Sequence, residues 1–395
     1  MSRPARNAFF LLPAALLLPA GGTPAQQADL EALRNEVDAR TEEVTPKVVA
    51  WRRDLHEHPE LGNREFRTSG IIAEHLRSLG MDVQTEVAHT GVVGILRGGL
   101  PGPVVALRAD MDALPVTEMV DLPFASTVRT EYAGQEVGVM HACGHDNHMA
   151  VLMGAAEVLA GMRDRLPGTV KFIFQPAEEG PPAGERGGAS LMVEEGVLEN
   201  PRPDAIFGLH VMPSPTGFIG YRAGGAMASV QTLQIVVKGR QTHGAMPWGG
   251  VDPIVTAAQI ILGLQTVVSR QADLTKAPAV VTIGQINGGI RSNIIPDSVV
   301  MVGTVRTLDP AMQAEIEEGI RRTAEGIAES AGATADVLLS RGAAVTYNDP
   351  ALARRMAGTL EWVAGPGMVS EVPAITGSEA PRTSWKCRGS SSSWG

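Results

Sequence analysis

The sequence predicts an α/β protein with a second, smaller α+β domain. A length of 395 residues is long for one core and favours two domains. Three short apolar runs with strand character alternate with helical patterns, which is typical of an α/β sheet. A later segment has the order strand, helix, strand, strand, helix, strand, which is typical of a ferredoxin-like unit. We therefore expect a leader at 1–25, a first domain at 26–226 and 342–395, and a second domain at 227–341.

Composition and charge exclude some classes of partner. The chain has 33 Lys and Arg against 43 Asp and Glu, a formal charge of -10, so nucleic acid is not an expected partner. No basic run suits a membrane surface, so the mature form is expected to bind no membrane. Hydrophobic residues make up 44% of the chain, which is enough to bury sizeable cores.

Residues 1–25 have the pattern of a secretory signal peptide. Arg3 and Arg6 precede an apolar stretch, Phe9–Ala20, that is too short to span a bilayer. Small residues at Thr23–Ala25 suit a cleavage site. An uncleaved anchor is the alternative, and either reading predicts a periplasmic or secreted protein.

The segment Ala28–Ala73 is predicted to be helical, because apolar residues recur in it every three or four positions. Pro59 interrupts the pattern. His56 and His58 lie at this interruption. We favour structural roles for both histidines, and metal ligation is the alternative.

The stretch His141–His148 concentrates side chains that bind metals. Cys143 and His145 alternate, so both point the same way in an extended chain, and thiolate with imidazole suits zinc. An apolar helix is predicted directly behind them, at Met149–Ala160, and its N-terminus favours the thiolate. The alternative is that Cys143 and His145 are buried residues with a purely structural role. A disulfide to Cys387, the only other cysteine, would remove Cys143 as a ligand.

Polar side chains follow the three predicted strands, which are Pro103–Leu107, Thr169–Phe174 and Asp204–Leu209. Because the carboxyl ends of strands in such sheets form the ligand-binding edge, we expect these side chains to meet at one crevice. The alternatives are that the aspartates only cap a loop and that the paired glutamates only form a solvated charged surface. The residues concerned are Arg108, Asp110 and Asp112, then Gln175, Glu178 and Glu179, and finally His210.

The second domain carries two weaker signals. One is His243, within Gln241–Pro247, and the other is the Gly-rich segment Asn287–Pro296. Arg291 and Asn293 in that segment are suited to holding a carboxylate. The elements expected around them are strands at Val230–Val237, Ala279–Ile286, Ser298–Thr307 and Ala335–Leu339, and helices at Pro253–Ser269 and Ala311–Ala331.

Six motifs in this order resemble the amidohydrolase branch of the aminoacylase and carboxypeptidase G metallopeptidases, which includes hippurate hydrolase and the indole-acetyl-amino-acid hydrolases. The resemblance implies a catalytic domain that binds two divalent metal ions, interrupted by a ferredoxin-like lid domain that usually forms a homodimer. The motifs are Leu55–Leu61, Arg108–Pro115, His141–Asp146, Gln175–Gly180, Gly208–Val211 and Thr242–Pro247.

The resemblance also implies roles for individual residues. Glu178 matches the general base, Asp112 the carboxylate that orients the site, and His243 the lid histidine that stabilises the oxyanion in a neighbouring subunit. Zinc, manganese and cobalt all remain open as the metal. The residues that match the metal ligands are Cys143, His145, Glu179 and His210.

Together with these residues, the resemblance implies a metal-dependent amidohydrolase that cleaves the amide bond of N-acyl amino acids such as hippurate. Glu178 would take a proton from the attacking water and pass it to the leaving amine. Two alternatives stay open: a dipeptidase or carboxypeptidase of the same family, and a catalytically impaired periplasmic binding relative.

The C-terminal segment departs from the family pattern. The resemblance implies one further histidine ligand there, but the nine histidines of this chain end at His243. No family motif follows Thr376–Glu379, and a polar tail with Ser390–Ser393 comes next. We hypothesise a truncated or frameshifted tail from about residue 380, with a natural tail as the alternative. Weak metal occupancy and low stability are the expected consequences.

Overall fold

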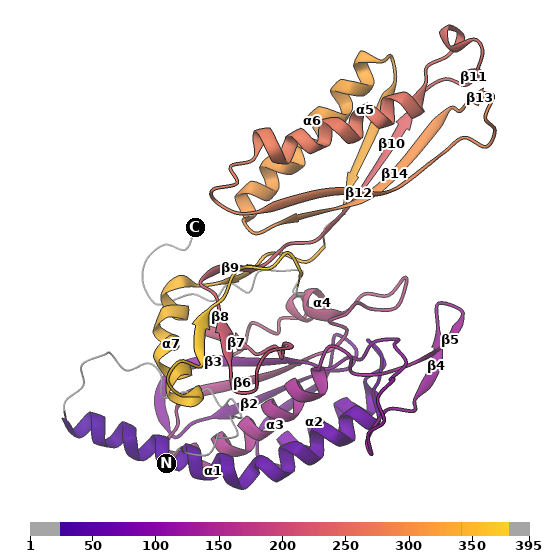
Figure 1. Ribbon diagram of the computed structural model, residues 1–395. Helices are drawn as coiled ribbons and strands as arrows, with labels where there is room; N and C mark the ends of the chain where they lie inside the picture. The colour runs from indigo at the N-terminus through magenta and orange to yellow at the C-terminus, as the bar shows by residue number, and fades with distance from the viewer. Residues whose placement is uncertain (1–23, 341, 379–395) are drawn as a thin grey trace. The chain divides into compact units, whose positions relative to one another are not determined.

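The computed structural model describes residues 24–340 and 342–378 (Figure 1). Among these, 24–219 and 355–370 form one compact unit, and 220–340, 342–354 and 371–378 form another. The second unit therefore includes the described part of the predicted segment 227–341. It also includes 220–226, 342–354 and 371–378, which were predicted to belong to the first domain. The expected leader at 1–25 lies almost wholly outside the described residues, and so does the tail from about residue 380.

The first unit is built on a five-stranded sheet. The three strands predicted from the sequence are β3 (Leu100–Asp110), β6 (Pro167–Gln175) and β7 (Ala205–Gly208), and they run parallel. Two further strands, β1 (Asp82–Val87) and β2 (Gly91–Arg97), extend the sheet in antiparallel fashion, giving the order β1-β2-β6-β3-β7. The three parallel strands thus end at one edge, as the sequence predicts.

Apolar side chains cover both faces of this sheet. Phe172 and Phe174 of β6 face one core, and Ile173 between them faces the other, because successive side chains of a strand alternate. The first core is closed by α1 (Pro24–Glu57), α2 (Phe66–Ser78) and α3 (His145–Gly161), and the second by α4 (Gly188–Glu194). The predicted helical segment is thus two helices, with Pro59 between them.

Smaller elements complete the first unit. They are a hairpin of β4 (Arg129–Tyr132) and β5 (Gln135–Gly138) and a short 3₁₀ helix at Arg163–Arg165. Strand β8 (Ile219–Tyr221) pairs with β17 (Val369–Glu371), and helix α7 (Pro350–Ala364) precedes β17 in the chain. The boundary between the units falls within each of these three elements.

The second unit has the predicted order of elements. Its antiparallel sheet has the order β12-β14-β10-β15, and the inward side chains of β10 are fully buried. Asp252 and Asp309 cap its two helices through backbone N–H groups, and a proline follows each aspartate at the first helical position. The elements are β10 (Gln231–Lys238), α5 (Pro253–Thr266), β12 (Ala279–Gly288), β14 (Ser298–Thr307), α6 (Pro310–Ser330) and β15 (Thr334–Leu339).

Short strands decorate this unit. Strand β11 (Thr242–His243) pairs with β13 (Ile294–Ile295), and β9 (Gly224–Met227) pairs with β16 (Thr346–Asn348). A 3₁₀ turn lies at Pro247–Gly249, and a π turn at Val267–Gln271 continues α5.

Helix α5 with its continuation, Pro253–Gln271, is the one helix of the described chain that is long and apolar enough to cross a membrane. Length and composition alone are weak evidence, since core helices of globular proteins have the same properties. Ile260 and Leu264 of α5 are fully buried in the core of the second unit. The packing is therefore that of a globular domain.

Candidate metal centre

The site begins where the three parallel strands end. Asp110 at the end of β3 is in register with Gln175 at the end of β6, and Arg108 is in register with Gly208 of β7. The loops that leave these strands carry Asp112, the Glu178–Glu179 pair and His210. The predicted convergence of these residues is therefore observed within the first unit.

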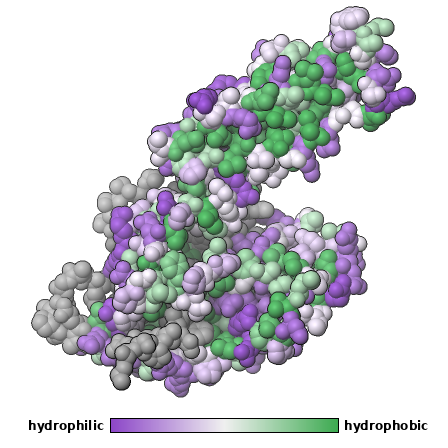
Figure 2. Space-filling model, in the orientation of Figure 1, coloured by the Kyte–Doolittle hydropathy of each residue, from purple (hydrophilic) through white to green (hydrophobic). Residues whose placement is uncertain are grey.

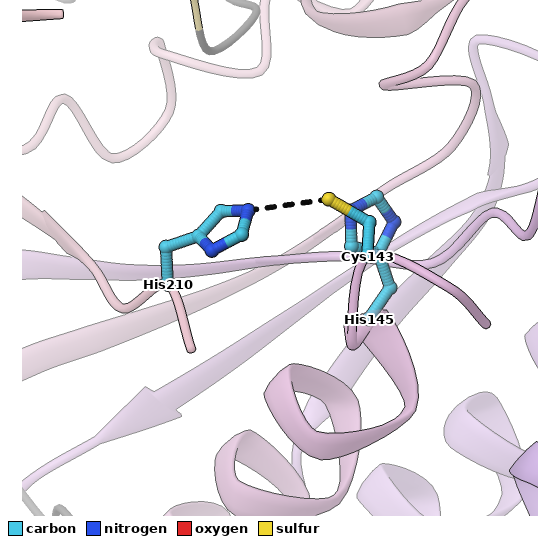
Figure 3. A group of neighbouring side chains, drawn as sticks. All are labelled: Cys143, His145 and His210. Carbon is cyan, nitrogen blue, oxygen red and sulfur yellow. Dashed lines mark hydrogen bonds between the residues drawn. The ribbon is translucent and has the colours of Figure 1, made fainter. Parts of the chain in front are cut away.

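Cys143, His145 and His210 form the centre of the site (Figure 3). The sulfur of Cys143 lies 3.5 Å from Nε2 of His210. One ligand atom from each of the three residues lies within 4.8 Å of the other two. Two ligands at about 2.0–2.3 Å from a tetrahedral ion lie roughly 3.3–3.7 Å apart, so the sulfur and the imidazole are spaced as a metal requires.

The chain between Cys143 and His145 is not extended, contrary to the sequence interpretation. Gly144 has φ +86°, a left-handed conformation, and His145 is the first residue of α3. A Cβ atom at Gly144 would lie 2.3 Å from Cγ2 of Val211. Glycine is thus needed both for the turn and for the approach of the His210 segment.

Glu178 and Glu179 lie close to His145, which is also part of the cluster with Cys143 and His210. His145, Glu178 and Glu179 form a second group with ligand atoms within 4.8 Å, and Nε2 of His145 is 4.0 Å from Oε1 of Glu179. Glu178 is half-buried. Three of the four residues predicted as ligands, Cys143, Glu179 and His210, therefore lie around the imidazole of the fourth, His145.

The environment of His145 fits a cation. Its side chain is fully buried, and within the described part of the chain neither ring nitrogen makes a well-formed hydrogen bond. Nδ1 lies 3.3 Å from Oδ1 of Asp112. Burial by itself would lower the pKa of His145, but Asp112 and the sulfur of Cys143 outweigh it and raise the pKa to about 12. Such a surplus of negative charge suits a divalent ion, whose binding would displace the proton.

His148 supports the site and was not singled out from the sequence. Its Nδ1 lies 2.5 Å from Oδ1 of Asp110, and its Nε2 accepts the N–H of Val211 at 2.9 Å. Because Nε2 is an acceptor, Nδ1 carries the proton and both nitrogens are occupied. Although Asp110, His145 and His148 also cluster, we interpret His148 as the support of the His210 segment. The sequence signal that could have identified His148 is its position three residues after His145, because residues three apart on a helix lie on the same face.

Asp110 is held ionised by its neighbours. Burial would raise the pKa of Asp110, but the Arg108 guanidinium, which donates to Oδ2 at 2.8 Å, and His148 hold that pKa below its ordinary value. Asp110 therefore acts as an anchor for His148.

The histidines at the end of α1 have structural contacts, as expected. The ring of His56 lies between Oδ2 of Asp146 at 2.8 Å and Oε1 of Glu118 at 3.0 Å, and its side chain is 6% exposed. The hydrogen bond that the ring of His56 donates to Asp146 raises the pKa of His56, against the effect of burial. His58 is exposed and contacts the backbone carbonyl of Asp54. The His56–Asp146 contact joins α1 to the first turn of α3, next to His145.

Three residues predicted in the second unit lie close together in that unit. His243 in β11 pairs with Ile294 in β13, and the N–H of Gly244 donates to the carbonyl of Asn293 at 2.8 Å. His243, Arg291 and Asn293 are all exposed. The described unit therefore presents an imidazole beside a loop with a guanidinium and an amide.

Comparison with known proteins identifies relatives over most of the chain. The family model described as peptidase family M20/M25/M40 matches residues 106–387, a range that runs past Glu379, where the recognisable motifs end. Thermostable carboxypeptidase 2 from Saccharolobus solfataricus is 41% identical over 324 residues, covering 81% of this chain and 78% of the relative. N-acyl-L-amino acid amidohydrolase from Geobacillus stearothermophilus is 38% identical over 341 residues, covering 83% and 88%.

A solved structure is also similar. It is a protein from Bacillus subtilis described as a dinuclear metal binding peptidase from the M20 family. It shares 38% identity with this chain and a TM-score of 0.72, covering 86% of this chain and 84% of that one.

Proposed function

Because the chain belongs to peptidase family M20/M25/M40 and is a metal-dependent hydrolase, we propose that it cleaves the amide bond of N-acyl amino acids, including hippurate. The observation that carries the proposal is the cluster of Cys143, His145 and His210 beside the Glu178–Glu179 pair. The products would be a carboxylic acid and an amino acid.

In this proposal Cys143, His145, Glu179 and His210 hold two divalent metal ions. When bound, the ions supply Lewis acidity that makes a water molecule easier to deprotonate. Zinc is favoured by the thiolate, and manganese and cobalt are accepted by the carboxylate and imidazoles.

Glu178 moves the proton. Its carboxylate takes a proton from water, the water oxygen bonds to the amide carbon, and Glu178 passes the proton to nitrogen as the C–N bond breaks. A half-buried position suits this role, because the carboxylate is reachable by substrate and partly shielded from bulk water. Asp112 orients the site by accepting the N–H of Glu179 at 2.8 Å and by lying beside His145.

The second unit is proposed to be a lid and dimerisation domain. His243 would stabilise the oxyanion in the neighbouring subunit, and Arg291 with Asn293 would bind the substrate carboxylate. Ile254, Val255 and Leu262 of α5 are 42–71% exposed, which supports an interface on this helix. Figure 2 shows hydrophobic residues gathered on this unit. The outer position of β12 in the sheet supports the same proposal, since an edge strand offers unpaired backbone groups.

A carboxypeptidase activity is the second candidate, because a relative at 41% identity is named thermostable carboxypeptidase 2. A panel of N-acyl amino acids and dipeptides with the same C-terminal residue separates the two activities. A catalytically impaired binding relative would bind these compounds without turning them over.

Export to the periplasm or the medium is proposed from residues 1–25. The test is cell fractionation of the full-length protein with sequencing of its mature N-terminus. Recovery of the uncut chain in the cytoplasm would contradict it.

The test of the function compares the wild-type protein with Glu178→Gln in hippurate hydrolysis with Mn²⁺ or Zn²⁺. Loss of general-base catalysis should lower kcat by about 10²–10⁴-fold with metal content unchanged. Glu194→Gln is the matched control, because Glu194 is an exposed residue at the end of α4 and pairs with Arg186, which is also exposed. Equal activity of wild type and Glu178→Gln would refute the assignment of the base.

A further inference from the structure

The loop that carries Glu178 and Glu179 is held by two carboxylates. It leaves β6 at Gln175, and its backbone N–H groups on either side of Glu178 are both bonded. Oε1 of Glu65 accepts the N–H of Ala177 at 2.8 Å, and Oδ2 of Asp112 accepts the N–H of Glu179 at 2.8 Å. The two acceptors therefore bracket the residue proposed as the general base.

Ala177 has an uncommon conformation. Its φ is +47°, in the left-handed region that costs an L-residue roughly 1–2 kcal/mol. The residue persists there only if neighbouring contacts impose the conformation. One such contact is the bond to Glu65. Another is the close approach of Gly62, where a Cβ atom would lie 3.1 Å from Cα of Ala177 and 2.9 Å from the carbonyl oxygen of Gly180.

In the described part of the chain, Glu65 has a second partner, the Thr90 hydroxyl, but no role in capping the helix that it precedes. It is fully buried at the start of α2, yet its side chain does not cap that helix. Glu60 instead accepts the N–H groups of Arg67 and Thr68. The second oxygen of Glu65 accepts the hydroxyl of Thr90 at 2.5 Å. No salt bridge to Glu65 is found among residues 24–340 and 342–378, and burial of a carboxyl without a cationic partner is costly, so a compensating function is expected.

We infer that Glu65 is a positioning residue, which holds Ala177 left-handed and thereby sets the directions of the Glu178 and Glu179 side chains. The inference rests on the proposed function for the roles of those two glutamates. Burial, together with the charge of Asp112, raises the pKa of Glu65 to about 7. The protonated side chain can still accept from Ala177 through Oε1 and donate to Thr90, so the clamp needs an acceptor oxygen at that place rather than a charge.

Two variants separate position from charge. Glu65→Gln keeps the length of the side chain, an oxygen for Ala177 and a donor for Thr90. Glu65→Asp keeps the charge, but it is one methylene shorter and cannot reach both partners. We expect Glu65→Gln to retain kcat within about threefold, and Glu65→Asp to lose about 10–100-fold in kcat, the usual effect of losing a residue that orients a metal ligand. KM should change little in either variant.

Glu195→Ala is a matched control. Glu195 accepts the N–H of Ala88 at 2.6 Å, and Ala88 also has a positive φ, +50°. This variant removes the same kind of clamp from a turn that carries no proposed catalytic group. It should lower Tm without lowering kcat.

Metal binding gives a readout that is independent of turnover. In calorimetric titration with Mn²⁺ alone, Glu65→Asp should bind more weakly than wild type and Glu65→Gln should bind equally well. If the wild type binds Mn²⁺ but hydrolyses no N-acyl amino acid, the proposed function fails while the titration still tests Glu65. An active Glu65→Asp beside an inactive Glu65→Gln would overturn the inference, because charge would then be the requirement.

Discussion

Replacing Asp112 by asparagine tests how the site is oriented. Asp112 accepts the N–H of Glu179 through one oxygen and lies 3.3 Å from Nδ1 of His145 through the other. For Nε2 of His145 to bind a metal, Nδ1 must carry the proton and donate it. In Asp112→Asn the amide oxygen can serve one of these donors, and the amide NH₂ then faces the other. One donor is left without an acceptor in a buried place.

The size of the effect follows from that conflict. A hydrogen bond to a charged group contributes about 1.5–3 kcal/mol, and tenfold in affinity corresponds to about 1.4 kcal/mol. Asp112→Asn should therefore weaken Mn²⁺ binding and lower kcat by about 10–100-fold, the range typical of residues that orient metal ligands.

Calorimetric titration with Mn²⁺ and hydrolysis of an N-acyl amino acid measure the two quantities. Asp204→Asn is the control, because Asp204 also accepts a backbone N–H, that of Val104 in β3, at 2.9 Å. It lies before β7, at the opposite end of the strands from Asp112. The reasoning is refuted if Asp112→Asn binds Mn²⁺ within twofold of wild type, or if Asp204→Asn loses as much affinity.

Three further outcomes are expected. Gly144→Ala should destabilise the fold by about 1–3 kcal/mol in denaturant unfolding and weaken metal binding, because a Cβ atom there would lie 2.3 Å from Val211. Gly196→Ala is the control: Gly196 also has a positive φ, +85°, but open space around it, so this variant should show only the cost of the backbone strain. A chelator should lower Tm, and added Mn²⁺ should restore it, because Mn²⁺ at 100 times its Kd adds about 2.7 kcal/mol to the free energy of unfolding. A Tm that changes with neither reagent would contradict the metal centre. His56 has a raised pKa in the folded state because of Asp146, so its stabilising effect is complete below about pH 6.5 and is lost as pH rises through the folded pKa. His56→Phe should therefore lower the free energy of unfolding more at pH 5.5 than at pH 9. An equal loss at both pH values would contradict a stabilising role for the charged imidazole.

Much of the architecture could be predicted from local pattern. The apolar runs ending at Leu107 and Phe174 are β3 and β6, and the order of elements in the second unit is as predicted. Local pattern suffices here because strand and helix periodicity are properties of neighbouring residues. The extended chain assumed between Cys143 and His145 was wrong, because Gly144 is left-handed and α3 begins at His145. The close approach of Val211 to Gly144 comes from a distant segment and could not be read from local pattern either.

The sequence by itself determined which chemistry is available: a thiol, imidazoles and paired carboxylates placed at strand and helix ends, in motifs that identify the family. Only the tertiary structure decided which of these groups meet. It joined Cys143 to His210 across 67 residues, and Glu65 to Ala177 across 112. Such contacts depend on how the sheet and its helices pack in three dimensions, and no periodicity along the chain encodes the distance between two loops. The ligand cluster can therefore be predicted from the sequence, whereas the carboxylates that hold the loop of Glu178 and Glu179 in place can be identified only in the folded structure.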